Sequence, residues 1–239
     1  MEAESGAARP GCPAPRPRRG DLFGEAEERE GPDSGLDSAA AALADLSAEA
    51  HDAFALACMS DPPIAAAALR FARRVIAAAS RAGPLSSAEA RRAAEQAATD
   101  RGDGDVRLVR ERAYRVRREI DRMRGFLRFS LAGGIYTARC APDNFILPAL
   151  AGHFSARFGE SPWAVIDERR ALALRGGGAE PRIMALAEFE APGAAGEEPW
   201  EELWRLYHRS VNNEARQNPA LQARFIPLRY RRYLTEFKV

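Results

Sequence analysis

The sequence predicts an α+β fold that consists of an N-terminal helical bundle, a small antiparallel sheet of about four strands, and C-terminal helices. Apolar residues recur at helical spacing up to residue 124, and from Phe126 the period changes from 3.6 to 2. Helical spacing returns after Pro199. We expect a single domain over residues 38–239, with a helical part at 38–124 and a mixed part at 125–239.

The first 37 residues differ from the rest and are predicted to be a disordered, acidic, proline-rich tail. Residues 1–50 contain eleven acidic residues and five arginines, whereas residues 51–239 contain thirty basic and 23 acidic residues. No apolar segment follows the arginines at 16–19, as a signal peptide would require, and no run reaches the roughly 18 apolar residues that span a bilayer. We therefore expect a soluble, cytoplasmic protein without a membrane partner.

Four helices are predicted in the first half. An alanine-rich helix covers about 39–58. A second begins after Ser60 or Asp61, with two prolines suited to its first turn, and ends at Gly83 before a proline. Ser86 and Glu89 form a capping-box pattern that opens a third helix, to about Ala98. The acidic loop 100–105 then leads into the fourth.

The fourth helix is coated with arginine and lies within residues 106–129. Its apolar stripe consists of Val109, Ala113, Val116, Ile120 and Met123. Such an excess of positive charge can hold a polyanion, since nine arginines (107, 110, 112, 115, 117, 118, 122, 124 and 128) face three acids, Glu111, Glu119 and Asp121.

A solvated face is the alternative interpretation of these arginines. Lys238 is the one lysine among 35 basic residues, so a codon bias can account for arginine at many positions. Acidic neighbours at helical spacing can also pair with them, as in Glu111–Arg115, Arg115–Glu119 and Arg117–Asp121. The segment by itself leaves both interpretations open.

The strands follow from Phe126. Leu127, Phe129 and Leu131 alternate onto one face, Gly133–Gly134 indicates a hairpin, and Ile135–Cys140 is the returning strand. Asp143 is expected to cap a helix that ends at Phe158. Two short strands, Trp163–Ile166 and Ala171–Leu174, flank a charged turn, and Ile183–Phe189 is a weaker candidate.

The last part is predicted to be helical again. Pro199 opens a helix whose aromatic stripe (Trp200, Leu203, Trp204, Tyr207 and Val211) has the spacing of a core face rather than of an exposed base-stacking platform. The basic and aromatic segment at 228–237 is expected to form a closing helix.

Several motifs give the chain a family resemblance. They are MRGFLRF, APDNFIL, HFSARF, WAVIDERR, LWRLYHRSVNNEARQNPALQ and IPLRYRRYLTEF, in that order. Over roughly residues 60–239 the chain resembles a bacterial family with a domain of unknown function, whose members are labelled as DNA metabolism or DNA repair proteins. The family is typically encoded beside a radical-SAM protein, and its domain also occurs fused to a uracil-DNA glycosylase-like domain. The resemblance implies a DNA context and no particular reaction.

The sequence predicts neither a metal site nor a cofactor. Cys12, Cys58 and Cys140 lack the spacing of a zinc or iron–sulfur site, and no HExxH motif is present. Neither GxGxxG, a P-loop nor GxSxG occurs, so nucleotide cofactors and serine hydrolase chemistry have no support in the sequence.

The first functional hypothesis is a protein that binds single-stranded or damaged DNA, or presents it to the radical-SAM protein that the resemblance implies. The residues expected to contact nucleic acid are Arg118, Arg122, Arg128, Arg157, Arg170, Arg216 and Arg229. Such binding should weaken steeply with salt. His153 and Arg157 share a helix face, where they suit either a phosphate or the edge of the core.

The second hypothesis is an enzyme that acts on a nucleic-acid base or related substrate, with His153, Asp167 and Glu214 as acid, base or ligand. An aspartate at a turn such as Asp167 is more often a local cap. A third possibility is an interaction scaffold for the radical-SAM protein.

Overall fold

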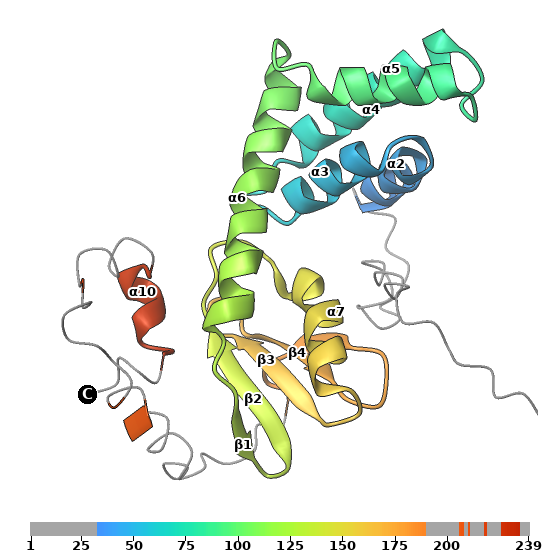
Figure 1. The fold of residues 1–239 in the computed structure, drawn as a ribbon. Coiled ribbons are helices and arrows are strands. Elements are labelled where there is room, and N and C mark those ends of the chain that lie inside the picture. The colour runs from blue at the N-terminus through green and yellow to red at the C-terminus, as the bar shows by residue number, and fades with distance from the viewer. Residues whose placement is uncertain (1–32, 190–205, 208–209, 211–217, 219–225, 235–239) are drawn as a thin grey trace, which may run out of the picture.

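The computed structural model describes residues 33–189, 206–207, 210, 218 and 226–234. Its α+β fold confirms the predicted class, with a helical bundle at one end and a sheet at the other (Figure 1). The helices are α2 (Asp33–Leu46), α3 (Ala48–Cys58), α4 (Ala65–Ala82), α5 (Ala88–Thr99), α6 (Gly104–Phe126), α7 (Leu147–Phe158) and α10 (Leu228–Arg231). The strands are β1 (Ser130–Ala132), β2 (Ile135–Cys140), β3 (Trp163–Asp167), β4 (Leu172–Gly176) and β5 (Arg182–Ala185).

Short polar side chains set where the bundle helices begin. Ser47 accepts a hydrogen bond from the amide of Ala50 (3.2 Å) before α3, and Ser87 accepts one from Ala90 (3.1 Å) before α5. Asp103 accepts bonds from the amides of the second and third residues of α6. Each bond satisfies an amide that has no partner inside its own helix. Buried alanines then allow α2–α5 to pack closely around Phe54 and Phe71.

Some boundaries differ from the predictions. The single helix predicted at 39–58 is two helices, because Ser47 adopts an extended conformation and starts α3 anew. Residues 33–37 belong to α2 rather than to the predicted tail, of which residues 1–32 lie outside the described part. The cap of α5 is Ser87 instead of Ser86, and α4 begins at Ala65, after both prolines.

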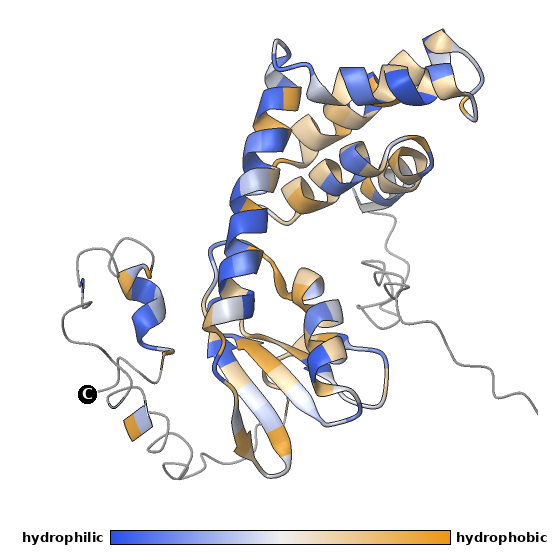
Figure 2. Cartoon of the chain, viewed as in Figure 1, coloured by the Kyte–Doolittle hydropathy of each residue, from blue (hydrophilic) through white to orange (hydrophobic). Residues whose placement is uncertain are grey.

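Helix α6 connects the two halves of the molecule (Figure 1). Its predicted apolar stripe is confirmed as buried. Val109 and Ala113 belong to the core of the bundle, whereas Val116, Ile120 and Met123 belong to the core under the sheet. Hydrophilic residues cover most of its visible length (Figure 2). The arginine-rich surface therefore lies on a helix that is held by a core at each end.

The sheet has five strands in sequence order and is mixed. The prediction of a purely antiparallel sheet is wrong for one pair, because β2 and β3 are parallel and the other neighbours are antiparallel. Helix α7 provides the crossover that a parallel pair requires. The hairpin at Gly133–Gly134 is confirmed, with positive φ at both residues. The strand expected from Phe126 is shorter, since α6 continues to Phe126 and β1 starts at Ser130.

Strand β3 is buried on both faces. Trp163 and Val165 lie in the core with α7, and the Trp163 ring centroid is 5.9 Å from that of Phe154. Ala164 and Ile166 pack on the opposite face with Phe189. The sheet is therefore the central layer of this half.

The structure describes only part of the C-terminal segment in which helices are predicted. Most of the helix expected from Pro199 lies outside the described residues. The expected closing helix is a short turn, α10, which buries Tyr230 in the core under the sheet. None of the described helices is both long and apolar enough to cross a bilayer.

Replacing Gly176 by alanine should destabilise the fold. A Cβ atom at Gly176 would lie 2.5 Å from two ring carbons of Trp163, whose side chain is fully buried and cannot move aside. We expect the free energy of unfolding to fall by about 1–3 kcal/mol, as overpacking does, measured by urea denaturation. The control is Gly152→Ala on the exposed side of α7, where a Cβ meets nothing within 4 Å and about 0.5–1 kcal/mol should be gained. Equal effects of both changes would contradict the packing described for Trp163.

Candidate functional site

A cleft of about 400 Å³ lies along α6. Side chains from α6, from α10, from the loops before α4 and α7, and from the turn between β3 and β4 surround it. They are Asp61, Arg112, Tyr114, Arg115, Arg118, Glu119, Arg122, Asp143, Asn144, Arg169 and Arg229. Six are arginine and three are acidic, so the lining carries an excess of three positive charges.

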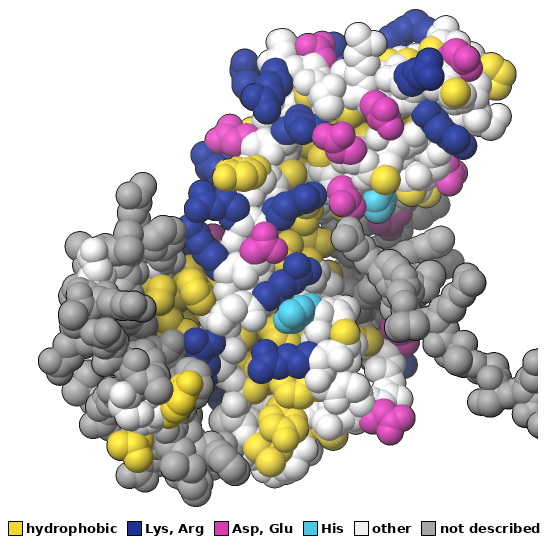
Figure 3. Space-filling view, viewed as in Figure 1, with side chains coloured by type: hydrophobic (Ala, Val, Ile, Leu, Met, Phe, Trp, Pro, Cys, Tyr) yellow, Lys and Arg dark blue, Asp and Glu magenta, His cyan; other side chains and the backbone are white. Residues whose placement is uncertain are grey.

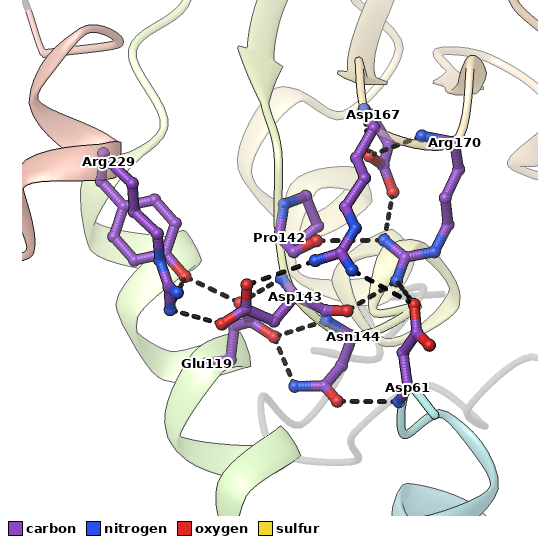
Figure 4. Close-up of polar contacts among 10 residues, drawn as sticks. Asp61, Glu119, Pro142, Asp143, Asn144, Asp167, Arg170 and Arg229 are labelled. Carbon is purple, nitrogen blue, oxygen red and sulfur yellow. Dashed lines mark hydrogen bonds and ion pairs between the residues drawn. The ribbon is translucent and has the colours of Figure 1, made fainter. Parts of the chain in front are cut away.

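Glu119 forms the floor of the cleft. Its side chain is 5% exposed, and its carboxylate accepts four hydrogen bonds. Oε1 accepts from the amide of Asp143 (2.7 Å) and the hydroxyl of Tyr230 (2.7 Å), and Oε2 accepts from the amide (2.9 Å) and the side-chain nitrogen (2.6 Å) of Asn144. Figure 4 shows Glu119 reaching from α6 toward Asp143 and Asn144. These charge-assisted bonds offset the cost of burying a carboxylate.

Tyr230 and Arg229 attach α10 to this floor. Burial raises the pKa of Tyr230 most, and the hydrogen bond to Glu119 raises it further. The hydroxyl therefore remains protonated and acts as a donor at neutral pH. The Arg229 guanidinium lies 4.7 Å from the centroid of the Tyr230 ring and pairs with the carboxylate of Asp143. Helix α10 is thereby joined to the loop before α7.

The turn between β3 and β4 provides a second internal junction. Asp167 is fully buried, and its carboxylate accepts bonds from the amides of Arg169 (3.0 Å) and Arg170 (3.3 Å). The Arg170 guanidinium donates to Asp167 (3.0 Å), to the carbonyls of Pro142 and Asp143, and to Asp61. Figure 4 shows Arg170 between these groups. The side chains of Asp167 and Arg170 therefore hold together this turn, the loop before α7 and the loop before α4.

The rim of the cleft has a different character from its floor. Arg112, Arg118 and Arg122 form no ion pair among the residues that the structure describes. Tyr114 is 61% exposed beside them, with the Arg118 guanidinium 5.7 Å from its ring centroid. Figure 3 shows basic side chains following the length of α6. The rim therefore offers positive charge that internal carboxylates do not neutralise.

The pairs expected on α6 form in part. Glu111–Arg115 is confirmed as an ion pair. Arg115–Glu119 does not form, because Glu119 is buried in the floor. Arg117 pairs with Asp52 at 3.8 Å rather than with Asp121, and Asp121 pairs with Arg124.

The predicted nucleic-acid contacts divide into groups. Arg118, Arg122 and Arg229 line the cleft. Arg170 is not part of the cleft lining and is bound internally, and Arg128, also outside the lining, donates to the carbonyl of Gly125 (2.7 Å). Arg216 lies outside the described residues, as does Glu214.

His153 and Arg157 lie exposed on α7, away from the cleft lining. Partial burial is the main cause that lowers the pKa of His153, and the positive charges of Arg124 and Arg157 lower it further. Among the described contacts no hydrogen bond joins His153 to Asp167, and no three His, Cys, Asp or Glu residues in that part of the chain form a possible metal site. The catalytic set of His153, Asp167 and Glu214 stays a prediction.

Sequence reasoning missed Glu119, Asn144 and Tyr114 as site residues. Glu119 could have been found, because it follows Val116 by three residues and precedes Met123 by four, which places an acid on the buried stripe. Asp143 was expected to cap α7, which is wrong: α7 begins at Leu147 without a side-chain cap. Its carboxylate instead pairs with Arg169 and Arg229.

Glu119→Gln should destabilise the protein strongly. An amide in place of the carboxylate leaves one acceptor oxygen and sets an NH₂ group against donors from Asp143 or Asn144. We expect a loss of about 2–4 kcal/mol in the free energy of unfolding, measured by chemical denaturation. Glu111→Gln is the matched control on the same helix, since its ion pair is exposed and should contribute no more than about 0.5 kcal/mol. A loss for Glu119→Gln as small as the control's would refute the floor described here.

His153 should titrate below the ordinary histidine range. Because its pKa is lowered on folding, the unfolded chain binds more protons, so stability should fall as the pH drops through about 6.5 and level off below the folded pKa. NMR titration of the imidazole measures this pKa. Arg157→Ala should raise it, whereas Arg107→Ala, at the far end of α6, should leave it unchanged. Arg157 suits the test because Arg124 is also paired with Asp121. An unaltered pKa in Arg157→Ala would exclude the Arg157 charge as one of the causes.

A family model described as a domain of unknown function, DUF4130, matches residues 85–236. The match spans α5, α6, the sheet, α7 and α10, and it includes every residue of the cleft lining except Asp61. Neither a curated protein nor a solved structure matches the chain.

Proposed function

The chain belongs to the DUF4130 family of domains of unknown function, and from this premise we propose that it binds nucleic acid in the cleft along α6. The observation that carries the proposal is the set of rim arginines without carboxylate partners among the described residues: Arg112, Arg118 and Arg122. Arginine is suited to phosphate oxygens because its guanidinium is always charged and presents a planar set of donors.

The length of the arginine row favours a polymer over a single phosphate. Arg112 and Arg122 are ten residues apart on one helix, which corresponds to about 15 Å along its axis. Charges along one strand of a duplex repeat about every 3.4 Å along the helix axis. The row can therefore follow several successive phosphates. Arg115, Arg169 and Arg229 also line the cleft, where each is paired with an acid.

The acids of the cleft form no ion pair with the rim arginines in the described part of the chain. The buried Glu119 carboxylate accepts its hydrogen bonds from uncharged donors, and Asp143 is paired with Arg169 and Arg229. Asp61 is paired with Arg169 and Arg170. A phosphate strand at the rim would thus meet guanidinium groups rather than free carboxylates.

The biological setting that we propose is DNA metabolism or repair, with presentation of the bound strand to a radical-SAM enzyme. This part is supported by the resemblance of the motifs from MRGFLRF to IPLRYRRYLTEF. The alternative of an enzyme that uses His153, Asp167 and Glu214 has less support, because the Asp167 carboxylate is buried and occupied by its turn and by Arg170. A scaffold for the radical-SAM enzyme would use the same surface.

Arg118→Ala and Arg122→Ala should each weaken binding of DNA by the full chain. Losing one phosphate contact should lower the affinity by about tenfold and reduce the slope of log affinity against log salt by about 0.7 for a single strand. Fluorescence anisotropy with a labelled oligonucleotide across a salt series measures both. Arg91→Ala is the control, since Arg91 is exposed on α5, at the end of the molecule away from α10 (Figure 1). If both rim variants bind as tightly as the Arg91 variant, the cleft is not the binding site.

A further inference from the structure

We infer that the nucleic acid held in the cleft is single-stranded, with one base stacked on Tyr114. The inference rests on the proposed function and specifies the class of ligand. It begins from a tyrosine whose exposure has no structural explanation. Tyr114 is 61% exposed and belongs to none of the three apolar clusters of the fold.

The neighbours of Tyr114 are suited to a nucleotide. Tyr114, Arg118 and Arg122 follow one another at intervals of four residues, so they lie on the same side of α6. The Arg118 guanidinium lies over the Tyr114 ring at 5.7 Å, within the range of a cation–π contact. A base on the aromatic ring would therefore place its own backbone beside the arginines that follow. Aromatic and guanidinium surfaces next to each other are how single-strand binding proteins hold bases and backbone together.

The stacking surface selects against duplex. Bases inside a duplex already stack on each other, and a side chain reaches the face of a base only when that base is unstacked. Phosphate contacts by Arg118 and Arg122 would not by themselves distinguish the two forms. The preference for a single strand thus depends on Tyr114.

A protein partner is a weaker explanation for the exposed ring. Docking surfaces for proteins usually contain a contiguous apolar patch. Tyr114 is the single aromatic or aliphatic side chain in the cleft lining as described, and the remaining lining is charged apart from Asn144. The chemistry around Tyr114 is that of a polyanion with exposed aromatic bases.

The test compares the full chain with Tyr114→Ala, Tyr114→Leu and Tyr114→Phe. Affinities are measured by anisotropy for a single strand of about 12 nucleotides, within the usual size of single-strand sites, and for its duplex. We expect Tyr114→Ala and Tyr114→Leu to lower single-strand affinity by about tenfold without changing the salt slope, because no phosphate contact is lost. Tyr114→Phe should restore most of the affinity, since it retains the ring. A 2-aminopurine base in the strand should be quenched by the native chain and less so by Tyr114→Leu.

The outcomes separate this inference from the proposed function. If Tyr114→Ala binds like the native chain while Arg118→Ala and Arg122→Ala bind weakly, stacking is excluded and the arginine site stands. If the native chain binds duplex as tightly as single strand, the single-strand preference is overturned. If neither the arginine nor the tyrosine variants change binding, the proposed function itself fails. Because Tyr114 is exposed, its variants should keep the native free energy of unfolding within about 0.5 kcal/mol, which denaturation verifies.

Discussion

The buried carboxylate of Glu119 is the interaction on which the rest of the site depends. A charge with 5% exposure is tolerated when donors surround it, and the four donors come from two segments distant in sequence. Asp143 and Asn144 precede α7, and Tyr230 belongs to α10. Satisfying one charge on α6 therefore fixes the loop and the C-terminal turn against the helix. Among the described residues, the cleft lies where these segments meet around the carboxylate beside α6.

The partners of the arginines distinguish positions that composition treats alike. In the bundle, Arg70 binds Asp105 through two hydrogen bonds, Arg74 pairs with Asp100 and Asp103, and Arg110 pairs with Glu49. These exposed pairs connect neighbouring helices and contribute little stability each. The rim arginines of the cleft differ, since three of them have no such partner in the described part of the chain. Exposed arginines elsewhere, such as Arg91 and Arg107, also lack an acidic partner among the described residues, so what distinguishes Arg112, Arg118 and Arg122 is that they line one cleft together.

The sequence was sufficient for features that depend on local spacing. The stripe from Val109 to Met123 and the glycine hairpin were predictable because a helix and a turn impose fixed patterns on nearby residues. The parallel pairing of β2 with β3 was not, since it depends on where α7 places the next strand. Glu119 escaped notice because its neighbours are charged and an i,i+4 ion pair with Arg115 was equally consistent with the spacing. Asp143 resembled a helix cap, and its true partners, Arg169 and Arg229, are 26 and 86 residues away.

The same residues that stabilise the fold also prepare the surface for a ligand. Arginine side chains lose considerable rotamer freedom when they bind, and a mobile backbone would add to that cost. Here the arginines project from a helix whose buried stripe is packed at both ends, from Val106 in the bundle to Met123 under the sheet. The floor at Glu119 holds the opposite wall at a fixed distance. The conformational entropy of this backbone is thus lost when the chain folds. Only the arginine side chains then lose conformational freedom on binding. A rigid row of guanidinium groups also retains its spacing, and spacing is what allows it to match successive phosphates of one strand.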